Sequence, residues 1–185
     1  PTVYDLLHVG NFRGVIFFNL MRHWFEKNNY TVDFVLNFTD IDDKIIKRAQ
    51  EKKTDPLALS QHYIGEYQKD IHSLNIKPHS SNPKCTDHIK GMIQFIETLI
   101  KKENAYEVEG SVFYDINQFE TYGHLSGKKI DDLNNVHRID PDPRKKNPLD
   151  FVLWKPAKPG EPSWDSPWGK GRPGWHIECS AMSHA

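Results

Sequence analysis

The sequence contains little of what marks a secreted or a DNA-coating protein. It has only two cysteines among 185 residues, and they lie far apart, at Cys85 and Cys179. A disulfide scaffold is therefore not indicated, and we expect a reducing, cytoplasmic location. The formal net charge is −1, which argues against a general DNA-coating protein because such proteins are clearly basic.

Long apolar runs are also missing. An apolar run such as residues 15–18 is far shorter than the roughly 20 residues that a membrane-spanning helix needs, so we expect no membrane partner. The first residues show neither the basic region nor the apolar stretch of a signal peptide. The sequence starts at Pro1 rather than at a methionine, so we expect the natural start to lie upstream.

The spacing of the apolar residues predicts helices that alternate with a buried strand. We expect helices over residues 12–28, 41–53, 55–74 and 87–102, and the strand over residues 31–38. The first helix is expected to bury a stripe of large apolar residues, namely Phe17, Leu20, Met21, Trp24 and Phe25. Such an alternation favours an α/β fold with a parallel sheet.

The composition changes after Asn104. Residues 105–108 and 111–115 are predicted to form a hairpin around Glu109 and Gly110, and residues 151–154 one more strand. Residues 156–174 are rich in proline, glycine and tryptophan. We expect them to form an ordered loop, because the tryptophans in or beside it need burial.

These changes predict three parts. Residues 1–103 would form the first half of the main domain and residues 104–168 a small α+β insertion. Residues 169–185 would begin the second half of the main domain, where a helix is expected from Trp175 onward.

A candidate phosphate site lies at residues 8–11, His-Val-Gly-Asn, where a strand end meets the start of a helix. A helix start presents free N–H groups and a positive partial charge to an anion, and Gly10 lets a ligand approach the backbone. His8 and Asn11 can both donate hydrogen bonds to phosphate oxygens. The alternative interpretation is that Asn11 is an ordinary helix cap and His8 a turn residue.

Other nucleotide motifs are absent or weak. No P-loop occurs, and the Gly-x-Gly-x-x-Gly match at residues 169–174 follows Ser166-Pro167-Trp168 rather than a strand. We expect this segment to be a loop that orders Trp175. Asp42 and Asp43 are interpreted as acids at a helix start. The basic stretches at residues 44–53 and 144–146 are interpreted as solvated faces.

The cysteines alone give no metal site. His176 and Cys179 are three residues apart and would share a helix face, which is compatible with metal ligation. The alternative is a buried structural Cys179, since no second cysteine lies nearby. Cys85 has no supporting context and is interpreted as inert.

Several segments nevertheless resemble cysteine–tRNA ligases, a family of class I aminoacyl-tRNA synthetases. They include Thr-Val-Tyr-Asp-Leu-Leu-His-Val-Gly-Asn at residues 2–11 and Asn-Phe-Thr-Asp-Ile-Asp-Asp-Lys at residues 37–44. Residues 147–155 and 160–164 match too, as does Gly-Arg-Pro-Gly-Trp-His-Ile-Glu-Cys-Ser-Ala-Met at residues 171–182. The segments are long, occur in order and span the chain.

The resemblance implies a Rossmann-like parallel sheet with flanking helices, interrupted by a connective insertion. It implies that ATP, with Mg²⁺, activates L-cysteine to cysteinyl-adenylate, which is then transferred to tRNA(Cys). It also implies a monomer. By similarity, His8, Gly10 and Asn11 bind ATP, and His8 and Asn11 are the catalytic phosphate contacts. Many members carry histidine where this chain has Asn11, which keeps a donor but cannot titrate.

The resemblance also implies that Thr2, Thr39 and Trp175 line a cysteine pocket and that Cys179 is one of four Zn²⁺ ligands. The other three ligands would lie two residues before Pro1 and beyond Ala185. We therefore expect this chain alone neither to charge tRNA nor to hold zinc tightly. Two alternatives stay open: a ligase that transfers cysteine to an amino sugar, and a non-catalytic nucleotide-binding module.

Overall fold

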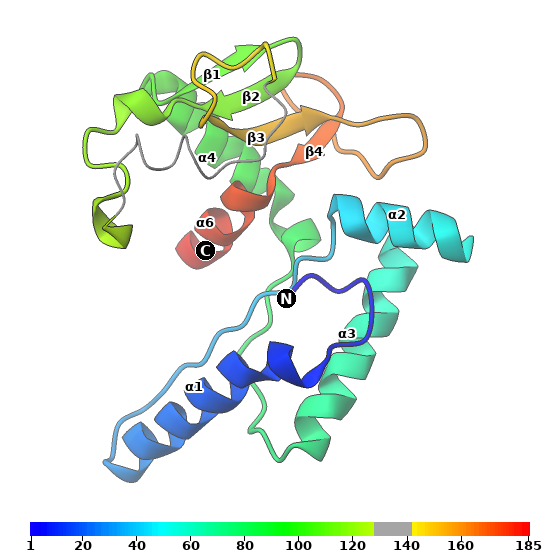
Figure 1. The fold of residues 1–185 in the computed structure, drawn as a ribbon, viewed down its shortest axis with the longest axis vertical. Helices are drawn as coiled ribbons and strands as arrows, with labels where there is room; N and C mark the ends of the chain where they lie inside the picture. Colours follow the sequence, from blue (N-terminus) through cyan, green and yellow to red (C-terminus); the bar gives the residue numbers. More distant parts are fainter. Residues whose placement is uncertain (128–141) are drawn as a thin grey trace. The chain divides into compact units, whose positions relative to one another are not determined.

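The computed structural model describes residues 1–127 and 142–185, which form two compact units, Pro1–Asp87 and His88–Ala185. The first unit contains the helices α1 (Val9–Lys27), α2 (Asp43–Lys52) and α3 (Pro56–Ser73), drawn from blue to green in Figure 1. The three parts predicted from the sequence have other boundaries than these two units, and that division stays a prediction. Within the described ranges no helix is both long and apolar enough to cross a membrane.

Helices α2 and α3 each begin directly after an aspartate that caps the first turn. The carboxylate of Asp42 accepts the Lys44 N–H at 2.9 Å at the start of α2, and that of Asp55 accepts the Ala58 N–H at 2.9 Å at the start of α3. Pro56 follows as the first helical residue, where its missing N–H costs nothing. The predicted start of α3 and the interpretation of Asp42 as an acid at a helix start are confirmed, whereas α2 begins at Asp43, two residues later than predicted.

The expected strand at residues 31–38 is only partly present. Thr2 pairs with Thr39, Val35 with Ser81 and Phe38 with Lys84, each as a single parallel bridge rather than a continuous ladder. The direction of pairing is parallel as predicted, but the prediction of a buried strand is wrong for Val35, which is 54 % exposed. Pairing at isolated residues leaves the side chains between them outside a regular pleat.

Helix α1 turns a different face to the core from the one expected. Phe12 and Arg22 are buried, while the predicted stripe is exposed at Phe17, Leu20, Met21, Trp24 and Phe25. Phe12 stacks on Tyr67 with ring centroids 5.9 Å apart, and Arg22 Nη1 donates to the Pro78 carbonyl at 2.7 Å. The stripe was assigned to the wrong face because the helix is oriented partly by polar contacts, such as that of Arg22 with the segment after α3. The hydropathy pattern does not register such contacts.

The core of the first unit is built from residues of all three helices and the bridged segments. Its buried members are Val3, Phe12, Phe38, Ile45, Ala49, Leu59, Tyr63, Ile64, Tyr67, Ile71 and Ile76. Leu74 is 46 % exposed because it is the residue that caps the C-terminal end of α3.

The second unit is an antiparallel sheet with two helices. A 3₁₀ turn (Cys85–His88) leads into α4 (Ile89–Lys101), and the sheet has the order β1 (Ala105–Val108), β2 (Ser111–Tyr114), β3 (Phe151–Pro156) and β4 (Gly171–Pro173). Helix α6 (Trp175–His184) closes the chain; α4 contacts β1, α6 contacts β3, and the two helices contact each other (Figure 1).

The predicted hairpin is confirmed and one strand was missed. Glu109 and Gly110 both have positive φ, 51° and 75°, as a tight two-residue turn between twisted strands requires. Strand β4 lies within the stretch that was expected to be a loop. It was missed because its three residues, Gly-Arg-Pro, are too few to show the alternation typical of a strand. The expectation that the tryptophans are buried is wrong for Trp175, which is 59 % exposed.

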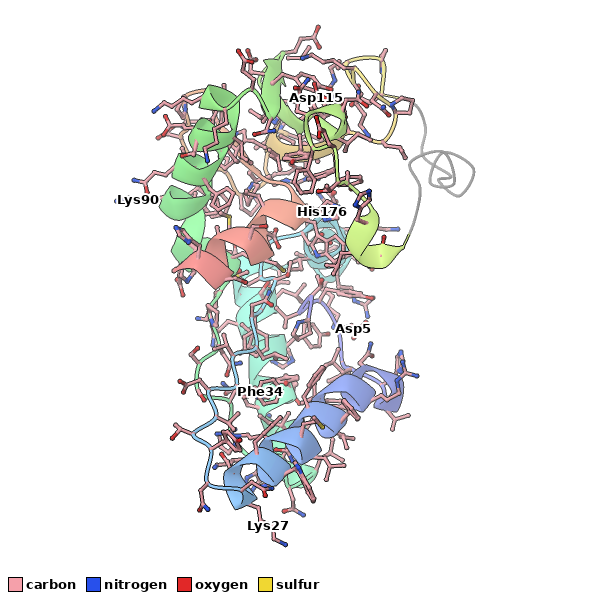
Figure 2. All side chains as sticks on the ribbon, turned by 90° about the vertical axis from the view of Figure 1, so that its left-hand side faces the viewer. Asp5, Lys27, Phe34, Lys90, Asp115 and His176 are labelled. Carbon is pink, nitrogen blue, oxygen red and sulfur yellow. The ribbon has the colours of Figure 1, made fainter. Side chains whose placement is uncertain are left out.

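Asp150 ties the sheet of the second unit to the turn after β2. This carboxylate is 1 % exposed, and it accepts hydrogen bonds from Tyr106 Oη at 2.6 Å, Asn147 N at 3.0 Å and Ile116 N at 3.1 Å. Burial and the neighbouring Asp150 raise the pKa of Tyr106, so its hydroxyl remains a donor. Figure 2 labels Asp115, the residue directly before Ile116 in the chain.

Replacing Asp150 by alanine should destabilise the second unit by about 3 kcal/mol, because three donors lose a charged acceptor in a buried place. Urea titration followed by tryptophan fluorescence measures this loss. Asp165→Ala, at an exposed position, is the matched control and should change stability by less than about 0.5 kcal/mol. Equal unfolding midpoints for the two variants would show that the network contributes little.

A half-buried histidine, His79, predicts a pH dependence in the first unit. His79 Nε2 lies 2.7 Å from Tyr67 Oη, and burial, with the charge of Arg22, lowers the pKa of His79 below its ordinary 6.5. The folded chain therefore binds fewer protons at His79 than the unfolded chain. The stability is fully present above about pH 6.5 and is lost as the pH falls through the lowered pKa.

Between pH 7 and pH 5 the free energy of unfolding should therefore drop because of this group. Thermal unfolding at a series of pH values tests it. His79→Gln should flatten the dependence, whereas the exposed His72→Gln should keep it. A wild-type curve no steeper than that of His79→Gln would contradict the assignment.

Candidate functional site

The start of α1 is a reciprocal cap made by two of the predicted site residues. His8 precedes the helix with extended backbone angles, and its Nδ1 accepts the Gly10 N–H at 3.1 Å. In return, Asn11 Oδ1 accepts the His8 N–H at 3.1 Å. The alternative interpretation, with Asn11 as the cap and His8 as a turn residue, is therefore wrong in its assignment: His8 is the cap residue, and Asn11 lies in the first turn and completes the cap with its side chain.

The same geometry leaves two donors for a ligand. Because His8 Nδ1 accepts, the hydrogen-bond pattern assigns the proton of the neutral ring to Nε2. Because Asn11 uses its oxygen, its Nδ2 amide also remains to donate. Both side chains are exposed, and no residue in the described part of the chain bonds these two nitrogens. Capping and anion binding are thus compatible here.

Gly10 leaves room for the His8 ring in the cap. A Cβ on this residue would stand 2.9 Å from His8 Cε1 and 3.0 Å from His8 Nδ1, so a side chain would push the ring aside. The helix behind this start is 19 residues long and carries no acid in its first turn. Its free N–H groups and dipole therefore present an uncompensated positive end.

Thr2 and Thr39 are brought together although 37 positions separate them. The Val3 N–H donates to the Thr39 carbonyl at 3.2 Å, and the Thr39 N–H donates to the Pro1 carbonyl at 2.9 Å. Thr39 is 3 % exposed. The segment between Thr2 and the cap is held by Asp5, which pairs with Arg48 on α2.

Asp40 is a positioning residue that the sequence alone did not single out for this role. Its carboxylate, 5 % exposed, accepts the Thr86 N–H at 3.1 Å and the Thr86 Oγ1 hydroxyl at 2.6 Å. Ser60 Oγ donates to the Asp40 carbonyl at 2.9 Å. These contacts fix the backbone directly after Thr39. The sequence offered one sign of this role: Asp40 is an acidic residue close to Asp42 and Asp43, but it neither caps α2 nor lies within it.

Trp175 and Cys179 belong to the second unit, where both lie on α6. Gly174, just before the helix, donates its N–H to the Leu153 carbonyl at 2.8 Å, and a Cβ there would stand 2.0 Å from the Val152 carbonyl oxygen. Helix α6 can therefore begin directly against β3 only because residue 174 is glycine. Its first residue, Trp175, is left exposed.

Cys179 is an exposed free thiol, so the alternative of a buried structural cysteine is wrong; the buried one is Cys85. His176, labelled in Figure 2, packs its ring on Phe151 with centroids 4.7 Å apart, and partial burial of the imidazole lowers its pKa. Among residues 1–127 and 142–185, no three or more His, Cys, Asp or Glu side chains are grouped so that they could hold a metal ion.

Comparison with known proteins gives a consistent result. The family model described as tRNA synthetases class I (C) catalytic domain matches residues 1–185. A cysteine–tRNA ligase of Bdellovibrio bacteriovorus is 56 % identical over 182 residues, 98 % of this chain and 38 % of that relative. Cysteine–tRNA ligases of Pelotomaculum thermopropionicum and Pyrococcus furiosus are 53 % and 52 % identical, each over 99 % of this chain. The chain spans 38 % of the length of these relatives.

Removing the His8 side chain should loosen the first turn of α1. His8→Ala loses the acceptor for the Gly10 N–H and should cost about 1 kcal/mol of local stability, whereas His8→Asn keeps an acceptor and should cost little. Amide hydrogen exchange at Gly10 reports this directly. His23→Ala, in an exposed part of the same helix, is the control. Unchanged Gly10 protection in His8→Ala would show that the cap does not hold the turn.

Proposed function

The chain belongs to the family of class I tRNA synthetase (C) catalytic domains, and we propose that the whole protein activates L-cysteine with ATP and transfers it to tRNA(Cys). The supporting observation is the cap at the start of α1, where His8 Nε2 and Asn11 Nδ2 remain free to donate at a positive helix end. The names of the relatives agree with this reaction. ATP, accompanied by Mg²⁺, cysteine and tRNA(Cys) are the proposed substrates.

In the first step, a carboxylate oxygen of cysteine attacks the α-phosphorus of ATP. The new O–P bond gives cysteinyl-adenylate, and the bond to the β-phosphate breaks to release pyrophosphate. The carboxylate is ionised at neutral pH, so the step needs no general base. Catalysis is then positioning together with stabilisation of charge on the phosphate oxygens. His8 and Asn11 are proposed to donate to those oxygens, and the dipole of α1 adds to the effect.

Cysteine itself is proposed to contact Thr2, Thr39 and Trp175. The bridge between Thr2 and Thr39, together with the contacts of Asp40, makes two of these positions rigid. Rigid positions suit selection of a small substrate, because a displacement of about 1 Å costs much of the rate.

The proposal also includes a zinc ion bound through Cys179. Cys179, an exposed thiol on α6, would supply one thiolate ligand. A closed zinc site needs four ligands, and within the described ranges no group of three candidate ligands is placed to complete one. The described residues by themselves do not fit the ion, so the mechanism above does not depend on it.

The test is cysteine-dependent exchange of pyrophosphate into ATP, followed by charging of tRNA(Cys), by the whole protein. Asn11→Asp keeps the oxygen that caps His8 but replaces the amide donor with a negative charge. It should lower the exchange rate about 100-fold or more, the loss typical of one oxyanion donor, with little loss of stability. Asn29→Asp adds the same charge just beyond the far end of α1, at an exposed residue, and should leave the rate unchanged.

The outcomes separate the candidate functions. Exchange with charging supports the ligase. Exchange without charging would point to transfer onto another acceptor, such as an amino sugar. Neither activity in a folded protein would favour a nucleotide-binding module, and equal rates for Asn11→Asp and wild type would remove Asn11 from the site.

A further inference from the structure

The segment that leads into the His8 cap is attached to α2 by an ion pair that the proposed reaction does not use. Asp5, labelled in Figure 2, lies three residues before His8, and its Oδ2 accepts a hydrogen bond from Arg48 Nη2. Its other oxygen, Oδ1, accepts the N–H of the next residue, Leu6, at 2.9 Å. One carboxylate therefore both shapes the bend before His8 and fastens that bend to α2.

Helix α2 is a fixed support for this contact. Its residues Ile45, Ile46 and Ala49 are buried, so the helix cannot turn about its axis without exposing them. Arg48 is also held from its own helix, because its Nη1 donates to Glu51 Oε2 at 3.2 Å. The guanidinium therefore meets Asp5 from a defined direction.

Lys52, one helical turn after Arg48, ties the same part of α2 to α3. Its Nζ donates to the hydroxyl of Tyr63, a residue that is 5 % exposed, and lies 5.1 Å from the centre of the Tyr63 ring. Arg48 and Lys52 thus both have partners outside α2. The basic stretch at residues 44–53 is not a uniform solvated face, as its sequence suggested.

Asp5 is ionised in this arrangement. Burial alone would raise its pKa, but the Leu6 N–H and the charges of Arg48 and Lys52 lower the pKa below its ordinary value of 3.8. The carboxylate therefore keeps its charge at neutral pH, and the ion pair with Arg48 persists there.

The geometry of the pair suits placement better than stabilisation. Its side chains are partly exposed, that of Arg48 to 33 % and that of Asp5 to 39 %, and ion pairs of this kind add little to the free energy of folding. A catalytic group that is misplaced by about 1 Å, by contrast, can cost about 100-fold in rate. With only two residues between Asp5 and His8, a shift of Asp5 carries over to the His8 ring.

We propose that Arg48 is a positioning residue for the activation of cysteine, and that it acts through Asp5 on the direction in which His8 Nε2 points. The inference rests on the proposed function, because it assigns a support to the same phosphate contact. Arg48 itself touches neither ATP nor cysteine in this proposal.

The experiment measures kcat and KM of cysteine-dependent pyrophosphate exchange by the whole protein. Arg48→Ala removes the cation, whereas Asp5→Asn keeps an oxygen for the Leu6 N–H and turns an amide toward Arg48. Each variant should lower kcat about tenfold and keep the KM for cysteine within about twofold of wild type. The melting temperature should fall by less than about 3 °C.

Two comparisons separate positioning from a general loss of structure. The double variant Arg48→Ala/Asp5→Asn should lose about tenfold rather than about 100-fold, because both residues act through one contact. Arg48→Lys keeps a cation that can donate to Asp5 and should recover kcat to within about threefold of wild type. Lys47→Ala removes an exposed cation from the same helix, and this matched control should leave kcat unchanged.

Three kinetic results would each overturn the proposal. They are a wild-type kcat in Arg48→Ala, an additive loss in the double variant, and no recovery in Arg48→Lys. The first of these would show that Tyr4 and Leu7, which pack against the core of the first unit, are enough to place His8.

Amide hydrogen exchange at Gly10 in the whole protein gives a readout that needs no activity. Because Gly10 donates to the His8 ring, its N–H should exchange faster in Arg48→Ala than in Lys47→Ala. Unchanged Gly10 exchange in an active enzyme refutes only this inference. Faster Gly10 exchange together with no pyrophosphate exchange by wild type refutes the proposed function but supports the link from Arg48 to the cap.

Discussion

Backbone N–H and C=O groups that belong to no helix or continuous strand ladder must still find partners, and the first unit is organised around this requirement. The extended segment before Thr39 meets its neighbours only through single bridges. Side chains supply part of the missing partners. Ser80 Oγ accepts the Phe34 N–H at 2.9 Å, and Asn82 Nδ2 donates to the Leu36 carbonyl at 2.7 Å. Polar residues at residues 80–86 therefore hold the segment that positions Thr39.

The candidate phosphate site depends on the same kind of pairing. His8 and Asn11 each spend one heteroatom on the first turn of α1, and this fixes the direction in which the other heteroatom points. A ligand would then meet donors that are already oriented, which lowers the reorganisation needed in a reaction. The cap that stabilises the helix and the site that binds the anion are one arrangement of two side chains.

In the second unit, the carboxylates of Asp150 and Asp142 hold separate segments together, as backbone pairing does in the first unit. Asp150 accepts hydrogen bonds from three donors in different segments, and Asp142 holds Arg144 against Ser111 of β2. The hydrogen bonds and charge of Arg144 lower the pKa of Asp142 to about 2, so the carboxylate stays ionised at neutral pH. A carboxylate that is always charged keeps the guanidinium of Arg144 in place.

The sequence by itself determined the local features. The caps Asp42 and Asp55, the Glu109–Gly110 turn and the family resemblance of residues 2–11 depend on neighbouring residues, and short-range chemistry identifies them. Only the tertiary structure decided which face of α1 is buried, that Thr2 meets Thr39, and that Asp40 and Asp150 are buried acceptors. Those outcomes depend on partners tens of residues away, whose distances no local pattern encodes. Arg144 shows the same limit, because its partners Ser111 and Phe113 become neighbours only when β2 is in place.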